Sequence, residues 1–197
     1  MTMKKIILMA AVAMLAVTGV NAQSETKQEI AVSYGWLSNS DWLNVFEGIV
    51  DAVFGETYDE GSYLGPVSLE YFYNLEPWMG IGAIAVYGHE IEDSNKDGNK
   101  VGTRKNSYIS LMPAVKFNWL RRDMVALYSK LGVGATWRSE IKEFEGENSK
   151  YNSDKKDFHV NWQVSVIGVE VGKQIRGFAE YGLGEQGMLQ VGVRCRF

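Results

Sequence analysis

The feature that most constrains this chain is a repeated segment of about ten residues in which apolar side chains alternate with small or polar ones. The last segment is the clearest, because every second residue is apolar: Leu189, Val191, Val193, Cys195 and Phe197. Successive side chains of a β-strand point to opposite faces of the sheet. A period of two therefore predicts strands with one apolar face and one polar face.

Five more segments show the same regular alternation. They cover residues 30–36, 67–73, 109–119, 125–137 and 179–183. In the segment 109–119, for example, Ile109, Leu111 and Val115 alternate with Ser110 and Lys116. Short runs of this kind, bounded by turn-forming residues, indicate an all-β protein.

Two further segments alternate less regularly and complete a set of eight predicted strands. In residues 78–89 the glycines indicate one phase, which Ile84 and Val86 blur. In residues 158–171 the phase slips partway along the segment. A β-bulge at residues 166–168 would restore the register, because a bulge adds one residue to one strand of a pair.

The connections between these segments are short and long in turn. Tight turns are predicted at residues 74–77, 120–123 and 172–175, and long connections at residues 37–62, 90–106 and 138–157. The last connection, around residues 184–187, is short. Short turns at one end and longer loops at the other are typical of barrels that cross an outer membrane. The predicted fold is an eight-stranded antiparallel up-and-down transmembrane β-barrel.

Aromatic residues gather near both ends of the predicted strands. Trp78, Phe117, Trp119 and Phe197 lie beside the tight turns, and Trp36, Tyr87, Tyr108 and Trp137 lie beside the long connections. Two such girdles are expected at the two interfaces of a membrane. The alternative is a soluble barrel of lipocalin type, with an apolar interior. The interior set predicted here is small, polar and glycine-rich, as a narrow eight-stranded lumen requires, and this favours the membrane.

The predicted interior face carries charges of both signs: Glu70, Glu170, Glu180, Lys116, Lys130, Arg194 and Arg196. Buried charges require hydrogen-bonded partners of opposite sign. We expect these side chains to pair and to fill the lumen, because eight strands leave room for little else. A gated pore with a switchable ion pair is the alternative, and nothing in the sequence selects it.

The first 22 residues have the pattern of a secretory signal peptide. Lys4 and Lys5 precede an uncharged run of twelve residues, and Val20-Asn21-Ala22 provides a cleavage site. A membrane-spanning helix needs about 20 apolar residues, so the run is too short for an anchor. We expect cleavage after Ala22, which leaves residues 23–197 as the mature barrel domain.

The signal peptide, the eight alternating strands and the ending Val191-Gly192-Val193-Arg194-Cys195-Arg196-Phe197 resemble the small bacterial outer-membrane barrels of OmpA/OmpX type. The resemblance covers about residues 28–197 and lies in the pattern of strands rather than in particular residues. It implies location in the outer membrane of a Gram-negative cell, with contact to membrane lipid and lipopolysaccharide. It also implies that the insertion machinery of that membrane reads the terminal Phe197.

The first long connection departs from this pattern, because residues 40–54 carry apolar side chains at helical spacing and Gly55 follows as a stop. We predict a short amphipathic helix in this first extracellular loop. Such a helix would cover the barrel mouth, lie in the outer interface or bind a partner.

Two other sequence patterns bear on a metal site and on a catalytic site. Residues 93–98 match the first half of a calcium-binding loop, but Arg104 stands where the bidentate glutamate belongs. His89 and His159, the only histidines, lie near the long-loop rim on different strands and in no recognisable spacing with a serine. No catalytic, cofactor-binding or metal-binding residue is therefore predicted.

The sequence as a whole predicts a non-enzymatic outer-membrane barrel with a structural or surface-interaction role in the cell envelope. A formal net charge of −4 does not favour nucleic-acid binding, and the single Cys195 excludes an internal disulfide. A narrow channel is the alternative in the transport class, and a lipid A-modifying enzyme is the less favoured alternative in the catalytic class. An extracellular ligand is not identified by the sequence.

Overall fold

The computed structural model describes residues 27–36, 57–96, 99–144 and 153–197. Its strands are β1 (Gln28–Trp36), β2 (Thr57–Glu76), β3 (Met79–Lys96), β4 (Asn99–Arg121), β5 (Val125–Phe144), β6 (Ser153–Gly172), β7 (Ile175–Gly184) and β8 (Leu189–Arg196). Each pairs antiparallel with the next, and β8 returns to β1. The predicted eight-stranded antiparallel barrel is confirmed. The predicted signal peptide and the predicted helix at 40–54 lie outside the described residues.

No helix among the described residues is long and apolar enough to cross a membrane.

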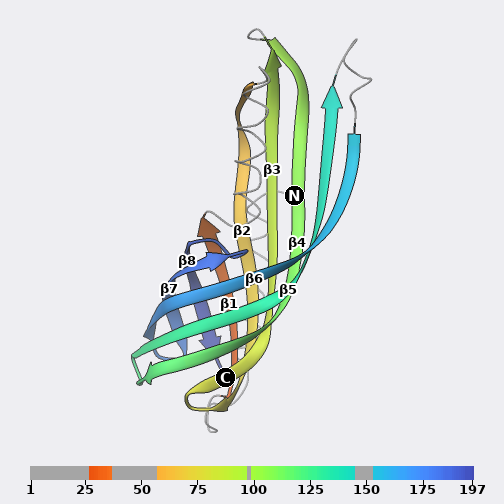
Figure 1. The fold of residues 1–197 in the computed structure, drawn as a ribbon. Coiled ribbons are helices and arrows are strands. Elements are labelled where there is room, and N and C mark those ends of the chain that lie inside the picture. Colours follow the sequence, from red (N-terminus) through yellow and green to blue (C-terminus); the bar gives the residue numbers. More distant parts are fainter. Residues whose placement is uncertain (1–26, 37–56, 97–98, 145–152) are drawn as a thin grey trace.

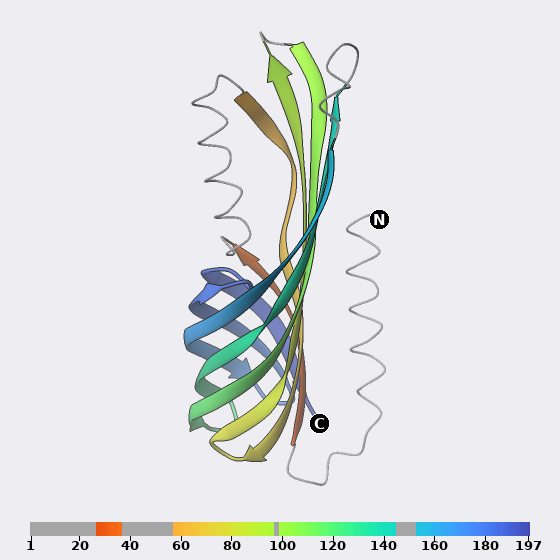
Figure 2. The same cartoon turned by 45° about the vertical axis from the view of Figure 1, so that its right-hand side comes forward.

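The strands fall into two length classes, which divide the molecule into two regions. Strands β1, β7 and β8 contain 8 to 10 residues, whereas β2 to β6 contain 18 to 23. The long strands continue past the closed ring as a tall, twisted sheet (Figures 1 and 2). We call this extension, residues 57–66, 88–96, 99–108, 138–144 and 153–160, the protruding sheet. The remaining strand residues form the closed barrel.

The protruding sheet corrects the predicted long connections. Strand β2 begins within the predicted loop 37–62, and strands reach from both sides into the predicted loops 90–106 and 138–157, so that β3 ends at Lys96 and β4 begins at Asn99. The apolar–polar alternation disappears in these segments because polar side chains stand on both faces, as the buried Arg104 and the partly exposed Lys105 do on β4. The backbone ladder continues nevertheless, since its hydrogen bonds do not depend on the side chains.

The side chains of the closed barrel have an inside-out distribution. Large apolar side chains lie on the outer surface with a third to three quarters of their area exposed, among them Leu69, Leu111, Leu131, Trp162 and Leu183. Charged and polar side chains are buried in the lumen. The predicted phases of the regular strands are confirmed.

The irregular alternation of β3 is explained by an apolar side of the lumen, and that of β6 by a bulge. Ile84 and Val86 point inward and pack with Phe72 and Met112, so one side of the lumen is apolar. In β6 the register shifts on both sides, and the adjacent Val166 and Ile167 are both exposed. The predicted bulge at residues 166–168 is confirmed.

The predicted outer girdle needs one correction. Trp36, Tyr87 and Trp137 are exposed as expected, but Tyr108 points inward and is only 7% exposed. Its partner in the register is Gly88, where an added Cβ would lie 2.3 Å from the tyrosine ring. The ring therefore occupies interior space that a side chain at residue 88 would fill.

The other residues assigned to the outer surface show one further difference. Trp78, Phe117 and Trp119 at the tight-turn end are exposed, and Phe197 is half-buried. Cys195 follows the predicted outward phase but is only 2% exposed. Its register partners are Ile30 on β1 and Ile175 on β7.

Candidate functional site in the lumen and on the protruding sheet

A network of ion pairs fills the lumen at the tight-turn end of the closed barrel. At its centre Arg194 from β8 donates to Glu70 at 2.6 Å and also to Glu170. Lys116 from β4 donates to Glu29 and lies 3.5 Å from Glu170. All of these side chains are fully buried. Strands from opposite sides of the ring are therefore tied together across the lumen.

The network continues upward and downward from this centre. Lys130 from β5 bonds to Glu70 and lies 2.8 Å from Glu180. Below, Arg196 donates to Glu170 at 2.6 Å and lies 3.0 Å from Glu29. Removing one member of a buried pair leaves an uncompensated charge, so each of these contacts constrains the others.

Aromatic rings pack against the cations of the network. The ring of Tyr128 lies 4.9 Å from the Arg194 guanidinium and 5.1 Å from the Lys116 ammonium. Phe178 lies 4.8 Å from the same guanidinium. Tyr128 also donates its hydroxyl to Glu180 at 2.5 Å. Cations held over ring faces in this way are stabilised beyond their ion pairs.

The turn between β7 and β8 forms a second polar layer above the network. Glu185 is fully buried and accepts hydrogen bonds from Ser110 at 2.7 Å, from Thr136 at 3.1 Å and from Asn161. These donors come from β4, β5 and β6. The turn therefore folds into the barrel and connects three strands of the opposite wall.

Gln186 links this second layer to the first. Its backbone N–H donates to Gln163 at 2.8 Å, and its side-chain amide donates to Glu70 at 2.8 Å. Gly184 and Gly187 flank the inward residues with φ of +134° and +98°. Only glycine adopts such angles at little cost, which is why the chain can reverse so tightly here. The lumen thus holds two connected layers of mutually bonded side chains.

The sequence predicted most of this network. All seven predicted interior charges are buried and brought together. Glu29 was missed because the predicted strand began two residues too late, at residue 30, although its alternation with Ala31 and Ser33 was available as a signal. Glu185 was missed because a charged residue in a short turn normally faces water, and no local signal indicates otherwise.

The protruding sheet carries its own polar cluster beyond the closed barrel. Arg104 lies 3.0 Å from Glu140, and Lys142 lies 3.2 Å from the same carboxylate oxygen. Burial by itself raises the pKa of Glu140, but the neighbouring Arg104 and Lys142 outweigh it and hold that pKa below its ordinary value of 4.5. The cluster therefore stays ionised at neutral pH.

The protruding sheet also has two open edges within the described part of the chain. There, β1 pairs with β2 only up to Val67, and β7 pairs with β6 only from Gln163 onward. Residues 57–64 and 153–160 thus have strand partners on one side only. An unpaired strand edge offers backbone donors and acceptors to another chain.

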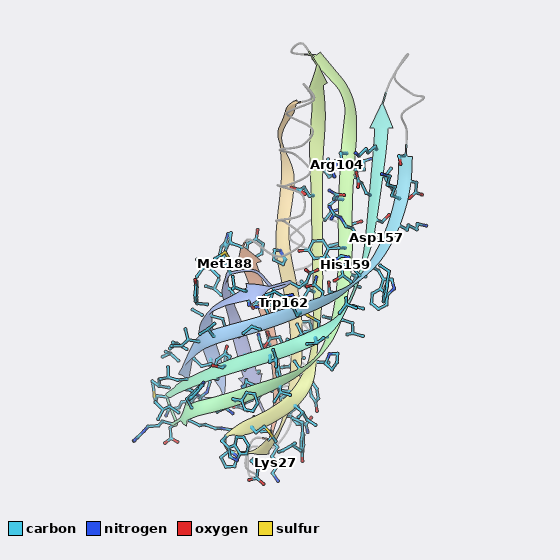
Figure 3. The ribbon with its side chains drawn as sticks, viewed as in Figure 1. Lys27, Arg104, Asp157, His159, Trp162 and Met188 are labelled. Atoms are coloured by element: carbon cyan, nitrogen blue, oxygen red, sulfur yellow. The ribbon has the colours of Figure 1, made fainter. Side chains whose placement is uncertain are left out.

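The two histidines do not converge. His89 follows the outward phase opposite Ser107, and its Nδ1 is buried with no hydrogen-bond partner. His159 belongs to the inward phase opposite Thr136 and lies below Asp157 on β6 (Figure 3). The outward neighbours of the His89–Ser107 pair are Tyr87 and Ile91 on β3 and Lys105 and Ile109 on β4, so no carboxylate adjoins the pair on these two strands. Such a pair lacks the third group that orients a catalytic base.

The calcium-like segment does not form a coiled loop in its described part. The backbone of residues 93–96 runs in the β3 ladder and pairs with β4. Calcium-binding loops of this type instead wrap their ligands around one point. Among the described residues, no group of three His, Cys, Asp or Glu side chains is placed to hold a metal ion.

The fold is similar to solved outer-membrane barrels. The structure of Ail, the attachment invasion locus protein of Yersinia pestis, in complex with the heparin analogue sucrose octasulfate, matches with a TM-score of 0.50 and 14% identity. A second structure of Ail from Yersinia pestis matches with a TM-score of 0.45 and 15% identity. Each match covers 88% of this chain and 100% of the Ail chain. No protein-family profile and no curated protein sequence matches the chain.

Proposed function

We propose that this chain is a non-enzymatic outer-membrane barrel protein with a closed lumen, which presents its protruding sheet at the cell surface. The observation that carries the proposal is the inside-out closed barrel, with apolar side chains outside and an ion network inside. In water, exposing so many large apolar side chains around a complete ring would cost much free energy. In a bilayer the same belt is the stable arrangement.

Several features support the orientation. Both described ends of the chain, at Lys27 and Phe197, lie with the tight turns, which face the periplasm in such barrels. The predicted signal peptide, with cleavage after Ala22, would provide export, and the terminal Phe197 would be read by the insertion machinery. The resemblance to barrels of OmpA/OmpX type and the similarity to the fold of Ail both favour this assignment.

The protruding sheet is the proposed interaction surface. Within the described residues it has two open strand edges, and it extends beyond the closed barrel (Figure 2). The neighbour Ail was solved with a sulfated heparin analogue, but the present sheet mixes acids with its cations, as Glu140 does between Arg104 and Lys142. We therefore do not propose a sulfated glycan as the ligand of this chain. Lipopolysaccharide would surround the base of the sheet as the outer-leaflet lipid.

The location is tested by gel migration of the protein from washed outer membranes, with and without boiling. A faster band before boiling is expected from a closed barrel that detergent does not unfold. Recovery in the soluble periplasmic fraction with no heat shift would contradict the membrane assignment. It would favour a soluble ligand-binding barrel instead.

The closed lumen distinguishes the proposed barrel from a narrow channel. Two bonded layers, one around Arg194 and one around Glu185, lie across the lumen. We expect no single-channel steps from the folded protein in a planar bilayer. Regular steps of fixed conductance would support the channel instead.

The non-enzymatic role is tested against the lipid A-modifying alternative. The positions of His89 and His159 on different faces do not favour a catalytic group. Expression is expected to leave the mass of lipid A unchanged. A changed mass that His159→Ala or His89→Ala abolishes would show an enzyme.

A further inference from the structure

The tight-turn mouth of the barrel contains a cavity of about 810 Å³ that the lumen network does not fill. Half of its twelve lining residues are cations, and two are acids. The cations are Lys27, Arg121, Arg122, Lys173, Arg176 and Arg196. They come from the residue before β1, from the end of β4, from the β4–β5 and β6–β7 turns and from β7 and β8. Separate parts of the chain therefore bring positive charge to one cavity, which Lys27 marks in Figure 3.

This mouth is held in shape by hydrogen bonds between the turns. Arg176 donates to the carbonyl of Lys173 at 2.9 Å, and to those of Arg122 and Asp123 at 3.1 and 2.8 Å. It is 4% exposed, so it ties the two turns together from within. The backbone N–H of Arg196 donates to Gln174 at 2.9 Å. The rim cations are thus mounted on a preorganised frame.

The interior network does not neutralise the rim. Arg196 on the cavity floor is already paired with Glu29 and Glu170. Lys27, Arg122 and Lys173 are exposed at the rim, on the tight-turn side of the buried glutamates. Cations that surround a concave site focus their potential within it and attract anions.

The position of the cavity indicates which anion it meets. Trp78 and Trp119 are exposed on the outer wall at the same end, 56% and 75% respectively, as expected of the girdle at the inner interface. The mouth then lies at the level of the phospholipid headgroups. Phosphate groups are the anions there, and guanidinium groups bind them well.

We propose that this cationic mouth binds the phosphate groups of an anionic ligand, either a phospholipid headgroup of the periplasmic leaflet or a soluble polyphosphate. The inference rests on the proposed function, since only a barrel in that membrane presents this mouth to the leaflet. A water molecule occupies roughly 30 Å³ in the liquid, so the cavity accommodates a ligand much larger than one phosphate ion. The ligand would lie against the rim cations and leave the interior ion pairs intact.

The test compares two charge-matched double variants of the folded protein. Lys27→Gln with Lys173→Gln removes two exposed rim lysines, and Lys155→Gln with Lys156→Gln removes two exposed lysines from the protruding sheet. Calorimetry in zwitterionic detergent measures binding of inorganic tripolyphosphate. Native mass spectrometry measures retention of phosphatidylglycerol from nanodiscs that contain it beside phosphatidylcholine.

We expect the rim variant to weaken binding by roughly tenfold at low ionic strength, because two charge contacts are lost, and the sheet variant to change it less than twofold. Phosphatidylglycerol retention without tripolyphosphate binding identifies the lipid source, and the reverse identifies a soluble one. Absence of both, equal loss in the two variants, or tighter binding of polyglutamate than of tripolyphosphate would overturn the proposal.

The unboiled gel shift is read on the same samples. A shifted band without ligand binding refutes this inference alone, whereas loss of the shift in the wild type refutes the membrane barrel.

Discussion

The closed barrel and the protruding sheet are built from the same strands, but they are stabilised differently. In the closed barrel, β2 to β6 have one face toward the apolar exterior and one toward the ion network. In the protruding sheet the same strands lose both environments and keep only their ladder and surface clusters such as Arg104–Glu140. The comparison teaches that the backbone ladder sets the length of a strand, whereas its surroundings set the side-chain pattern.

The largest expected effect is on the buried centre of the closed barrel. Arg194→Ala leaves Glu70 and Glu170 with less compensation in the lumen. We expect the free energy of unfolding in detergent to fall by ~3–5 kcal/mol, as for other broken buried pairs. Urea titration followed by tryptophan fluorescence measures it. Arg104→Ala on the protruding sheet is the matched control and is expected to cost less, because Glu140 keeps Lys142 and is partly exposed. Equal costs would contradict the contrast between the regions.

The outer wall gives the second largest effect. Val193 is exposed on the outward phase of β8, four residues after Leu189 on the same face. Val193→Arg is expected to destabilise the barrel in lipid by ~2–4 kcal/mol near the midplane. Leu189→Arg, closer to the interface, is expected to cost about 0–1 kcal/mol. Reversible unfolding in lipid vesicles compares the two. If Val193→Arg has no effect, the facing assignment is wrong.

A smaller effect is expected from the inward turn. Glu185→Ala leaves Ser110, Thr136 and Asn161 without their shared acceptor. Such a loss costs about 1–3 kcal/mol. Urea titration measures the stability, and a planar bilayer records the conductance. Because the layer around Arg194 remains, we expect the lumen to stay closed. Single-channel steps in this variant would show that the turn alone seals the barrel.

The smallest effect belongs to the protruding sheet and depends on pH. The pKa of Glu140 is lowered in the folded protein, so its carboxylate contributes stability above its ordinary pKa of 4.5. That contribution is lost as the pH falls through the lower folded pKa. Glu140→Gln is therefore expected to cost less than about 1 kcal/mol at pH 7 and nothing in strong acid. Stability measured against pH for both proteins tests this. A difference that grows as the pH falls would contradict the assigned pKa direction.

The sequence by itself determined the number of strands, the facing of the closed barrel and the seven interior charges it named. It could do so because a period of two is local, and because lipid and lumen demand opposite side chains of alternate residues. The slip in β6 was also readable, since a bulge adds one residue to the phase and leaves Val166 and Ile167 side by side on the outside.

Only the tertiary structure decided the rest. The strands of the protruding sheet leave no apolar–polar alternation, because both faces carry polar side chains, such as the buried Arg104 and the partly exposed Lys105, and the ladder to neighbouring strands extends them. Tyr108 follows the inward phase of Ser110, but only the register shows that Gly88 lies opposite it and leaves space for its ring. Glu185 turns inward because Ser110, Thr136 and Asn161 meet there only when the ring closes. Each of these features depends on contacts between residues far apart in the chain, and no local sequence pattern encodes such contacts.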